Sequence, residues 1–283
     1  MDFLRQTLIR DSSPTSALTI AGSDSGGGAG IQADLKTFAA HRVHGLSAVA
    51  ALTAQHTRGV TSVEVPPPAF LREQIDACFD DFDIPAVKIG MLANAEMIHA
   101  VGKALDQHCP QHIVLDPVMV ATSGAQLLAS TAIEILRKRL LPMATIITPN
   151  LHEAELLLGC KLETVDAMRQ ACDALLDLGA GGVVLKGGHL HLGDEVVDLV
   201  AIRRDTGGRM HREIRHPRLK VNAHGTGCTL AAAITARLAL GSETVDACIA
   251  ASDYVHRALK TGYRPGRSEV LVLDHFGAAA PKS

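Results

Sequence analysis

Short apolar runs alternate with longer segments of helical periodicity along most of the chain. Each run is nearly all apolar, which is typical of strands that are buried on both faces of a parallel sheet. The predicted strands are Ala17–Ala21, Ser47–Leu52, Ala86–Ile89, Ile113–Leu115, Thr145–Ile147 and Gly182–Leu185. This alternation predicts an α/β fold with a mostly parallel central sheet and helices on both faces.

Helical periodicity marks the segments between and after these strands. The predicted helices are Gly30–His41, Phe70–Phe82, Glu96–His108, Thr131–Leu140, Asp166–Leu178, Thr226–Leu240 and Thr244–Lys260. Two alternating stretches, Glu195–Arg204 and Met210–Arg215, flank Thr206-Gly207-Gly208 and predict an antiparallel hairpin at the sheet edge. Because no low-complexity linker or fixed-period repeat divides the chain, we expect one domain over residues 1–283, with 1–16 as a polar lead-in.

Composition narrows the class of protein. The 283 residues carry 27 Lys plus Arg and 30 Asp plus Glu, a net charge of -3, and aromatic residues make up only 3%. Without a basic patch or stacking surface, nucleic acid is excluded as a partner. The chain has no secretion signal and no stretch near the roughly 18 apolar residues that span a bilayer. Its six cysteines form no C-x-x-C pair, so we expect a soluble cytoplasmic protein with free thiols and no membrane partner.

A glycine-rich segment, Ala21–Gly30, follows the first predicted strand and opens a helix. Its small residues let the backbone approach an anion or a polar ring closely. Within it, Gly28-x-Gly30-x-x-Ala33 also fits the dinucleotide fingerprint of an oxidoreductase. That function requires an acidic residue about 20 positions on, which Ala48–His56 lacks. The segment also lacks the Gly-Lys-Ser/Thr ending of a P-loop, and a flexible turn is the simplest alternative.

A second glycine-rich segment, Asn222–Leu230, opens a long Ala-rich helix. The amides around Gly225 and Gly227 can form an anion-binding nest at the positive end of the helix dipole. Such a nest stabilises the charge on a phosphoryl group during transfer. Cys228 falls in the first helical turn, where the pKa of a thiol is commonly depressed, so a general base is possible there. The alternative is an inert cysteine that packs the helix start.

Eight motifs resemble those of the ribokinase superfamily, and within it those of the vitamin kinases that phosphorylate hydroxymethylpyrimidine and its monophosphate. The motifs also follow one another in the order found in that family. The motifs are ALTIAGSD (17–24), GGAGIQADLKT (27–37), TAQ (53–55), KIGML (88–92), VLDPVM (114–119), TPNLHE (148–153), LKGGH (185–189) and HGTGCT (224–229). The resemblance implies a ribokinase-like three-layer α/β/α sandwich. It also implies ATP-dependent phosphoryl transfer in thiamine biosynthesis, with Mg²⁺, and a homodimer.

The resemblance implies roles for individual residues at the phosphate end. The anion hole would comprise Gly225, Thr226 and Gly227, with Cys228 as the catalytic base. The residues assigned to ATP are Asn150, Lys186, His224 and Thr226, and those assigned to the metal are Asp116 and Glu153. A cation that retains waters needs only one or two carboxylates when phosphates supply the other oxygens. In ordinary alternatives, Asn150 caps the helix that follows it, and Lys186 is a solvated surface residue.

At the substrate end, the resemblance implies a pyrimidine pocket lined by Gly22, Ala29, Asp34, Gln55, Met91 and Val118. Asp34 and Gln55 supply the acceptor and donor groups that an aminopyrimidine edge requires, and Met91 supplies an apolar wall. The sequence departs from the family pattern at His56, at Ala223 and over 263–268 (Tyr-Arg-Pro-Gly-Arg-Ser). These departures affect the rim of the pocket and a nucleotide loop.

Two other functions remain open. Pyridoxal also carries a hydroxymethyl group on a nitrogen ring, so a pyridoxal kinase of vitamin B6 salvage fits the same fold. A non-catalytic ligand-binding protein is the second alternative, against which Cys228, Glu153 and Asp116 argue. A dinucleotide oxidoreductase is more distant, because the acidic ribose ligand is missing.

Overall fold

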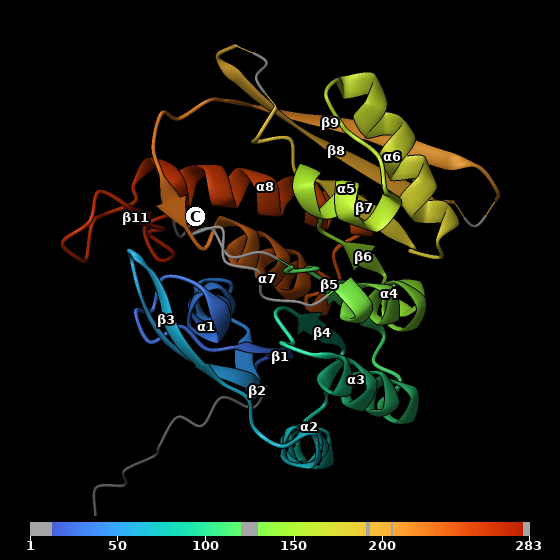
Figure 1. The fold of residues 1–283 in the computed structure, drawn as a ribbon, viewed down its shortest axis with the longest axis vertical. Coiled ribbons are helices and arrows are strands. Elements are labelled where there is room, and N and C mark those ends of the chain that lie inside the picture. Colours follow the sequence, from blue (N-terminus) through green and yellow to red (C-terminus); the bar gives the residue numbers. More distant parts are fainter. Residues whose placement is uncertain (1–12, 120–129, 191–192, 205, 280–283) are drawn as a thin grey trace, which may run out of the picture.

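A nine-stranded sheet forms the centre of the computed structural model, which describes residues 13–119, 130–190, 193–204 and 206–279 (Figure 1). Its strands are β1 (Ser16–Gly22), β2 (His44–His56), β3 (Gly59–Glu64), β4 (Ala86–Ile89), β5 (His112–Leu115), β6 (Ile146–Ile147), β7 (Gly182–Leu185), β8 (Glu195–Arg203) and β9 (Arg209–Pro217). The strand order is β3-β2-β1-β4-β5-β6-β7-β8-β9, parallel from β2 to β7 and antiparallel at both ends. All six predicted strands and the predicted edge hairpin are confirmed.

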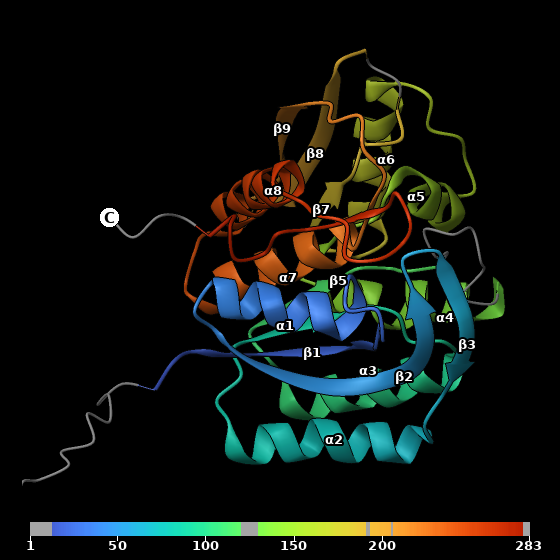
Figure 2. The same cartoon turned by 90° about the vertical axis from the view of Figure 1, so that its left-hand side faces the viewer.

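Helices cover both faces of the sheet (Figure 2). On one face lie α1 (Gly30–Ala40), α7 (Thr226–Ala239) and α8 (Thr244–Lys260). On the other lie α2 (Pro68–Asp81), α3 (Ala95–His108), α4 (Ser130–Arg139), α5 (Leu151–Leu158) and α6 (Val165–Asp177), with a 3-10 turn at Leu141–Met143. The three-layer α/β/α sandwich is therefore confirmed. The single domain over residues 1–283 stays a prediction.

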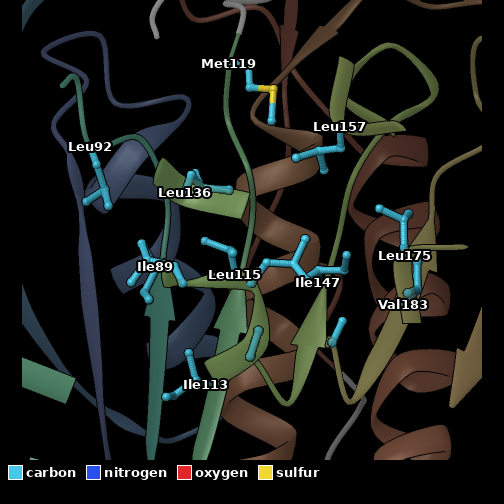
Figure 3. Packing of buried hydrophobic residues seen from close by; sticks show 14 of the residues in the cluster. Ile89, Leu92, Ile113, Leu115, Met119, Leu136, Ile147, Leu157, Leu175 and Val183 are labelled. Atoms are coloured by element: carbon cyan, nitrogen blue, oxygen red, sulfur yellow. The ribbon is translucent and has the colours of Figure 1, made fainter. Parts of the chain in front are cut away.

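Successive side chains of the central strands point to opposite faces of the sheet and form a hydrophobic core on each side. In β5, Ile113 and Leu115 pack under the larger helical layer, whereas Val114 packs toward α7 and α8. Figure 3 shows Leu115 beside Ile147 of β6, with Leu136 of α4 and Leu157 of α5 above them. Burying each such side chain stabilises the fold by about 1.5–3 kcal/mol. This double burial explains why the strands read as continuous apolar runs.

The antiparallel ribbon of β2 and β3 was predicted only in part. The predicted strand Ser47–Leu52 runs on to His56 in β2 and returns as β3, and the two strands curve away from the sheet (Figure 2). Beyond Leu52 the side chains alternate between exposed and half-buried, so no apolar run marks this part. The short parallel pair β10 (Ala223–His224) and β11 (Leu271–Val272) was likewise not predicted.

The cysteines form no disulfide with one another. All six are free thiols, as expected. In the part of the chain that the structure describes, no helix is long and apolar enough to cross a bilayer.

Candidate active site

The candidate site lies at the carboxyl edge of the parallel strands. Here β1 leads into the first glycine-rich segment, β4 into Met91, β5 into Asp116, β6 into Asn150 and β7 into Lys186. The helix starts of α1 and α7 meet at the same edge. Ligands of open α/β sheets bind at this edge, because loops and helix N-termini converge there.

The first glycine-rich loop is organised by a buried carboxylate. Asp24, 2% exposed, accepts hydrogen bonds from the backbone amides of Gly26 (2.8 Å), Gly28 (2.9 Å) and Ala29 (2.8 Å). Burial raises the pKa of Asp24, but His224 and the amides outweigh it and hold that pKa below its ordinary value. Asp24 was not predicted as a site residue, although an aspartate before a run of glycines is a signal for side-chain-to-backbone hydrogen bonding.

The two glycine-rich segments touch. Gly225, the N-cap of α7, has a φ of +84°, and a methyl group there would lie 1.9 Å from the carbonyl oxygen of Gly28. Gly30 has a φ of +55°, and a methyl group on it would lie 2.5 Å from the carbonyl oxygen of Gly22. Only glycine fits either position. The contact brings the start of α1 to Cys228, where the Gly30 amide favours the anionic form of the sulfur.

His224 lies against the substrate side of the site. Its Nε2 is 2.8 Å from Nε2 of Gln55 and 3.2 Å from Oδ2 of Asp24. The backbone amide of Gln55 donates to Ser25 Oγ at 2.8 Å, and its side-chain Oε1 accepts from Thr53 Oγ1 at 3.1 Å, so both parts of the residue are held. A residue that the resemblance assigns to ATP therefore contacts one that it assigns to the pyrimidine.

The remaining residues of the predicted pyrimidine pocket follow the carboxyl ends of β1, β4 and β5. The amide of Gly22 donates to the carbonyl of Met91 at 3.1 Å, and Ala29 is buried beside the Asp24 turn. Val118 is half-buried and donates its amide to the Asp116 carbonyl at 2.8 Å. The half-buried Met91 and Val118 offer the apolar surface that the sequence predicts for a ring.

The side chain of Asp34 is completely buried. Its Oδ2 accepts from Thr19 Oγ1 at 2.6 Å and from Lys88 Nζ at 2.8 Å, and the side chains of Asp34 and Lys88 are both 0% exposed. Its other oxygen, Oδ1, is also buried and has no hydrogen-bond partner among the described residues. Lys88 was not predicted as a site residue, because a lysine inside an apolar strand gives no signal of its partner.

Charged side chains gather beside the start of α7. Lys186 Nζ lies 3.1 Å from Asp116 Oδ1 and 3.9 Å from Glu153 Oε2, and Thr148 Oγ1 donates to the same Asp116 oxygen at 2.9 Å. The backbone of Gly227 passes this cluster, since a methyl group there would lie 3.1 Å from Lys186 Nζ. The alternative of a solvated surface lysine is wrong, because Lys186 is ion-paired and 18% exposed.

Asn150 caps α5, as the ordinary alternative predicted. Its side chain accepts from the Glu153 amide at 2.9 Å, and Glu153 Oε2 accepts from the Asn150 amide at 2.8 Å. This capping box fixes the Glu153 carboxylate beside Lys186. Among the described residues, no group of three His, Cys, Asp or Glu side chains could hold a metal. The assignment of Asp116 and Glu153 to a metal stays a prediction, and both carboxylates lie within 4 Å of Lys186 Nζ.

Burial dominates the electrostatics of Cys228 and Glu153. The expectation of a depressed thiol pKa was wrong. Burial raises the pKa of Cys228 to about 11, although Lys88 and the Gly30 amide oppose the change. The loss of solvation therefore outweighs the favourable position at a helix start. Burial likewise raises the pKa of Glu153 to about 7, against the attraction of Lys186.

A stability measurement tests the state of Glu153. Its pKa is about 7 in the fold against 4.5 ordinarily, so the folded state binds more protons between these values and the carboxyl destabilises the fold as pH rises. We expect Glu153→Gln, which keeps the cap acceptor, to match wild type near pH 4.5 and to be more stable by about 2 kcal/mol at pH 8. Urea unfolding of the unliganded protein at both pH values measures this. A difference that does not change with pH would contradict it.

The departures from the family pattern lie at the outer rim. The His56 ring is exposed and accepts from the Arg58 amide through Nδ1 at 3.2 Å. Ala223 pairs with Leu271. Tyr263 pairs with Val272, and a methyl group on Gly266 would lie 2.8 Å from Thr57 Oγ1 in the turn between β2 and β3. The loop over 263–268 therefore lies against the tip of this ribbon.

Comparison with known proteins decides the family. A family model described as phosphomethylpyrimidine kinase matches residues 24–272, which include every candidate site residue except Gly22. The chain belongs to the phosphomethylpyrimidine kinase family. The resemblance that the motifs indicated is confirmed.

Relatives of this kinase family match nearly the whole chain. The hydroxymethylpyrimidine/phosphomethylpyrimidine kinase of Rhizobium meliloti is 47% identical over 253 residues, which cover 88% of this chain and 91% of that relative. The thiamine biosynthesis bifunctional protein ThiED of Geobacter sulfurreducens is 46% identical over 264 residues, or 93% of this chain and 53% of that protein. The chain thus spans about half the length of the bifunctional relatives that it matches.

Solved structures confirm the ribokinase-like vitamin kinase fold. Phosphomethylpyrimidine kinase of Clostridium difficile 630 aligns with a TM-score of 0.76 at 43% identity, covering 86% of this chain and 99% of that chain. A pyridoxal kinase of Staphylococcus aureus in complex with pyridoxal aligns with a TM-score of 0.84 at 34% identity, covering 94% and 95%. The phosphomethylpyrimidine kinase family and the pyridoxal kinases therefore share this architecture.

Proposed function

We propose that this chain transfers the γ-phosphoryl group of ATP to the hydroxymethyl group of 4-amino-5-hydroxymethyl-2-methylpyrimidine, and then a second one to the monophosphate, in thiamine biosynthesis. The observation that carries the proposal is the meeting of Gly225–Cys228 with the Lys186 cluster on one side and buried Asp34 on the other. Relatives named hydroxymethylpyrimidine/phosphomethylpyrimidine kinase, at about 45% identity, support it.

The pyrimidine would bind between the first glycine-rich loop and the ends of β4 and β5. Asp34 Oδ1 is a buried acceptor without a partner among the described residues, which suits the exocyclic amine of the ring. The side chain of Gln55, held by His224 and Thr53, offers a second polar contact. Met91 and Val118 supply apolar contacts, so ring orientation would follow from one buried carboxylate and one fixed amide.

The ATP phosphates would lie against the start of α7. The amides of Gly225, Thr226 and Gly227 lie at the positive end of the dipole of α7, and Lys186 adds a point charge beside them. Asp116 and Glu153 would hold Mg²⁺, which neutralises charge on the phosphates when bound. Asn150 would support the site by keeping Glu153 in place.

Cys228 would act as the proton acceptor. In the transfer, the substrate hydroxyl proton passes to the Cys228 thiolate, the hydroxyl oxygen bonds to the γ-phosphorus, and the bond to the leaving oxygen of ADP breaks. Positioning of the hydroxyl in line with the γ-phosphate would supply most of the acceleration. Because the thiol pKa is about 11, the reactive thiolate becomes more abundant as pH rises through neutrality.

Pyridoxal kinase activity is the second candidate function. It is favoured by the structural match to a pyridoxal complex with a TM-score of 0.84, although at the lower identity of 34%.

The homodimer and the cytoplasmic location also stay predictions. Sedimentation of the purified protein would test the homodimer.

A substrate panel tests the proposed function. We expect ADP release with Mg²⁺ and ATP in the presence of hydroxymethylpyrimidine and of its monophosphate, with kcat/KM for pyridoxal at least about tenfold lower, because pyridoxal lacks the amine that Asp34 would bind. Turnover of pyridoxal alone would move the assignment to vitamin B6 salvage. Binding of the pyrimidine without any ADP release would support a non-catalytic protein.

A further inference from the structure

A fully buried ion pair lies beneath the proposed site. Lys88 is on β4, opposite Thr19 of β1, and both side chains bind Oδ2 of Asp34. Lys88 and Asp34 are each 0% exposed. Replacing such a pair with apolar residues is often neutral or stabilising, so its presence inside an apolar sheet calls for a reason other than stability.

The ion pair of Lys88 and Asp34 lies next to two groups that the substrate would contact, which are Oδ1 of Asp34 and the sulfur of Cys228. Because Lys88 and Thr19 converge on Oδ2, Asp34 Oδ1 is left without a partner among the described residues. One turn earlier on α1, the Gly30 amide favours the anionic form of the Cys228 sulfur, and α7, which carries Cys228, packs on β4.

Several charges surround the sulfur of Cys228. Lys88 on β4 is the strongest of the groups that favour its anionic form, whereas Asp34 on α1 and Asp116 after β5 oppose it. Lys186 after β7 also faces the sulfur. The pKa of Lys88 is raised by Asp34, so its ammonium stays charged despite full burial.

Resting on the proposed function, we propose that Lys88 is a positioning residue: its buried ammonium fixes Asp34 so that Oδ1 faces the pyrimidine, and supplies the fixed positive charge beside the thiolate of Cys228. One cation thereby serves both the substrate acceptor and the proton acceptor. Gly90 belongs to the same arrangement, because a methyl group on it would lie 2.7 Å from Lys88 Nζ.

Lys88→Gln tests the proposal, because glutamine keeps a donor for Asp34 and removes the charge. The readout is the rate at which iodoacetamide alkylates Cys228 between pH 7 and 10, measured on the Cys228 peptide by mass spectrometry so that the other five cysteines do not interfere. We expect the rate at a given pH to fall about tenfold in Lys88→Gln, because less thiolate forms. The rise of kcat with pH should shift to higher pH by about one unit, which corresponds to the tenfold loss of thiolate. KM for the pyrimidine should increase.

Thr19→Val is the matched control. It removes the other donor to Asp34 Oδ2 and changes no charge, so the alkylation profile should stay within about twofold of wild type. If Lys88→Gln does not fold, the pair of substitutions Lys88→Met and Asp34→Asn leaves no unpaired charge, and its alkylation profile should move in the same direction by a smaller amount.

An alkylation profile that Lys88→Gln leaves unmoved would overturn the inference. Its failure differs from failure of the proposed function. If Cys228→Ala retained activity, the proton-acceptor role would fail whatever the alkylation profile showed. If Cys228→Ala were inactive and Lys88→Gln kept the wild-type profile, only the role of Lys88 would fail.

Discussion

Replacing Cys228 with alanine is expected to lower kcat by about 10²- to 10⁴-fold while the protein stays folded. The sulfur lies at the start of α7, where the Gly30 amide and Lys88 face it, and alanine offers no proton acceptor there. A pKa of about 11 adds a second signature. Wild-type kcat should rise with pH from 7 to 9 by up to about tenfold per unit, and the residual activity of Cys228→Ala should lose this slope.

The matched control for this variant is Cys78→Ala. Cys78 is also a free, partly buried thiol, but it lies on α2, on the opposite face of the sheet. Its substitution should leave kcat and the pH slope unchanged. Steady-state ADP release and circular dichroism on both variants provide the comparison. A folded Cys228→Ala enzyme with near-wild-type turnover would leave the amides of the α7 start as the main source of catalysis.

The central sheet could be predicted because one physical rule governs it. Strands buried on both faces must be apolar throughout, so Ala86–Ile89 and Gly182–Leu185 were located exactly from their composition. The β2–β3 ribbon obeys another rule, because it leaves the two helical layers and becomes half-exposed. Its alternating polar side chains do not form the apolar run by which the other strands were located. The predicted strand Ser47–Leu52 therefore ended before Gln55, which lies in β2.

The candidate site was predictable as a set of residues but not as a network. Motif order placed Asp34, Gln55 and Cys228 in one site, yet their partners come from elements far apart in the sequence. Gln55 contacts His224, 169 residues away, and Asp34 is held by Lys88, 54 residues away. Such pairs depend on strand register and helix packing, which single-sequence patterns do not encode.

The thiol pKa shows why local rules fail in a buried site. A helix start favours the thiolate, and this local effect is what the sequence analysis used for Cys228. Enclosure of the sulfur by α1 and β4 removes water, and the resulting desolvation raises the pKa to about 11. The sign of the shift is therefore decided by tertiary packing, which also supplies the compensating Lys88.

Gly225→Ala is expected to disable the site through the backbone. The φ of +84° alone would strain an alanine by about 1 kcal/mol, and its methyl group would meet the Gly28 carbonyl oxygen at 1.9 Å. The two glycine-rich segments must then separate, which moves the amides of the α7 start away from the phosphates. We expect a loss of about 2–4 kcal/mol in the free energy of unfolding and at least a hundredfold fall in kcat.

Gly241→Ala separates strain from contact. Gly241 lies just beyond the other end of α7 with a φ of +82°, and a methyl group there would meet no atom within 4 Å. It therefore reproduces the backbone strain of Gly225→Ala without the collision, and should cost about 1 kcal/mol of stability with unchanged kcat. Urea unfolding and ADP release on both variants give the comparison. Equal losses of stability with full activity in both would mean that the contact between Gly225 and Gly28 does not shape the phosphate site.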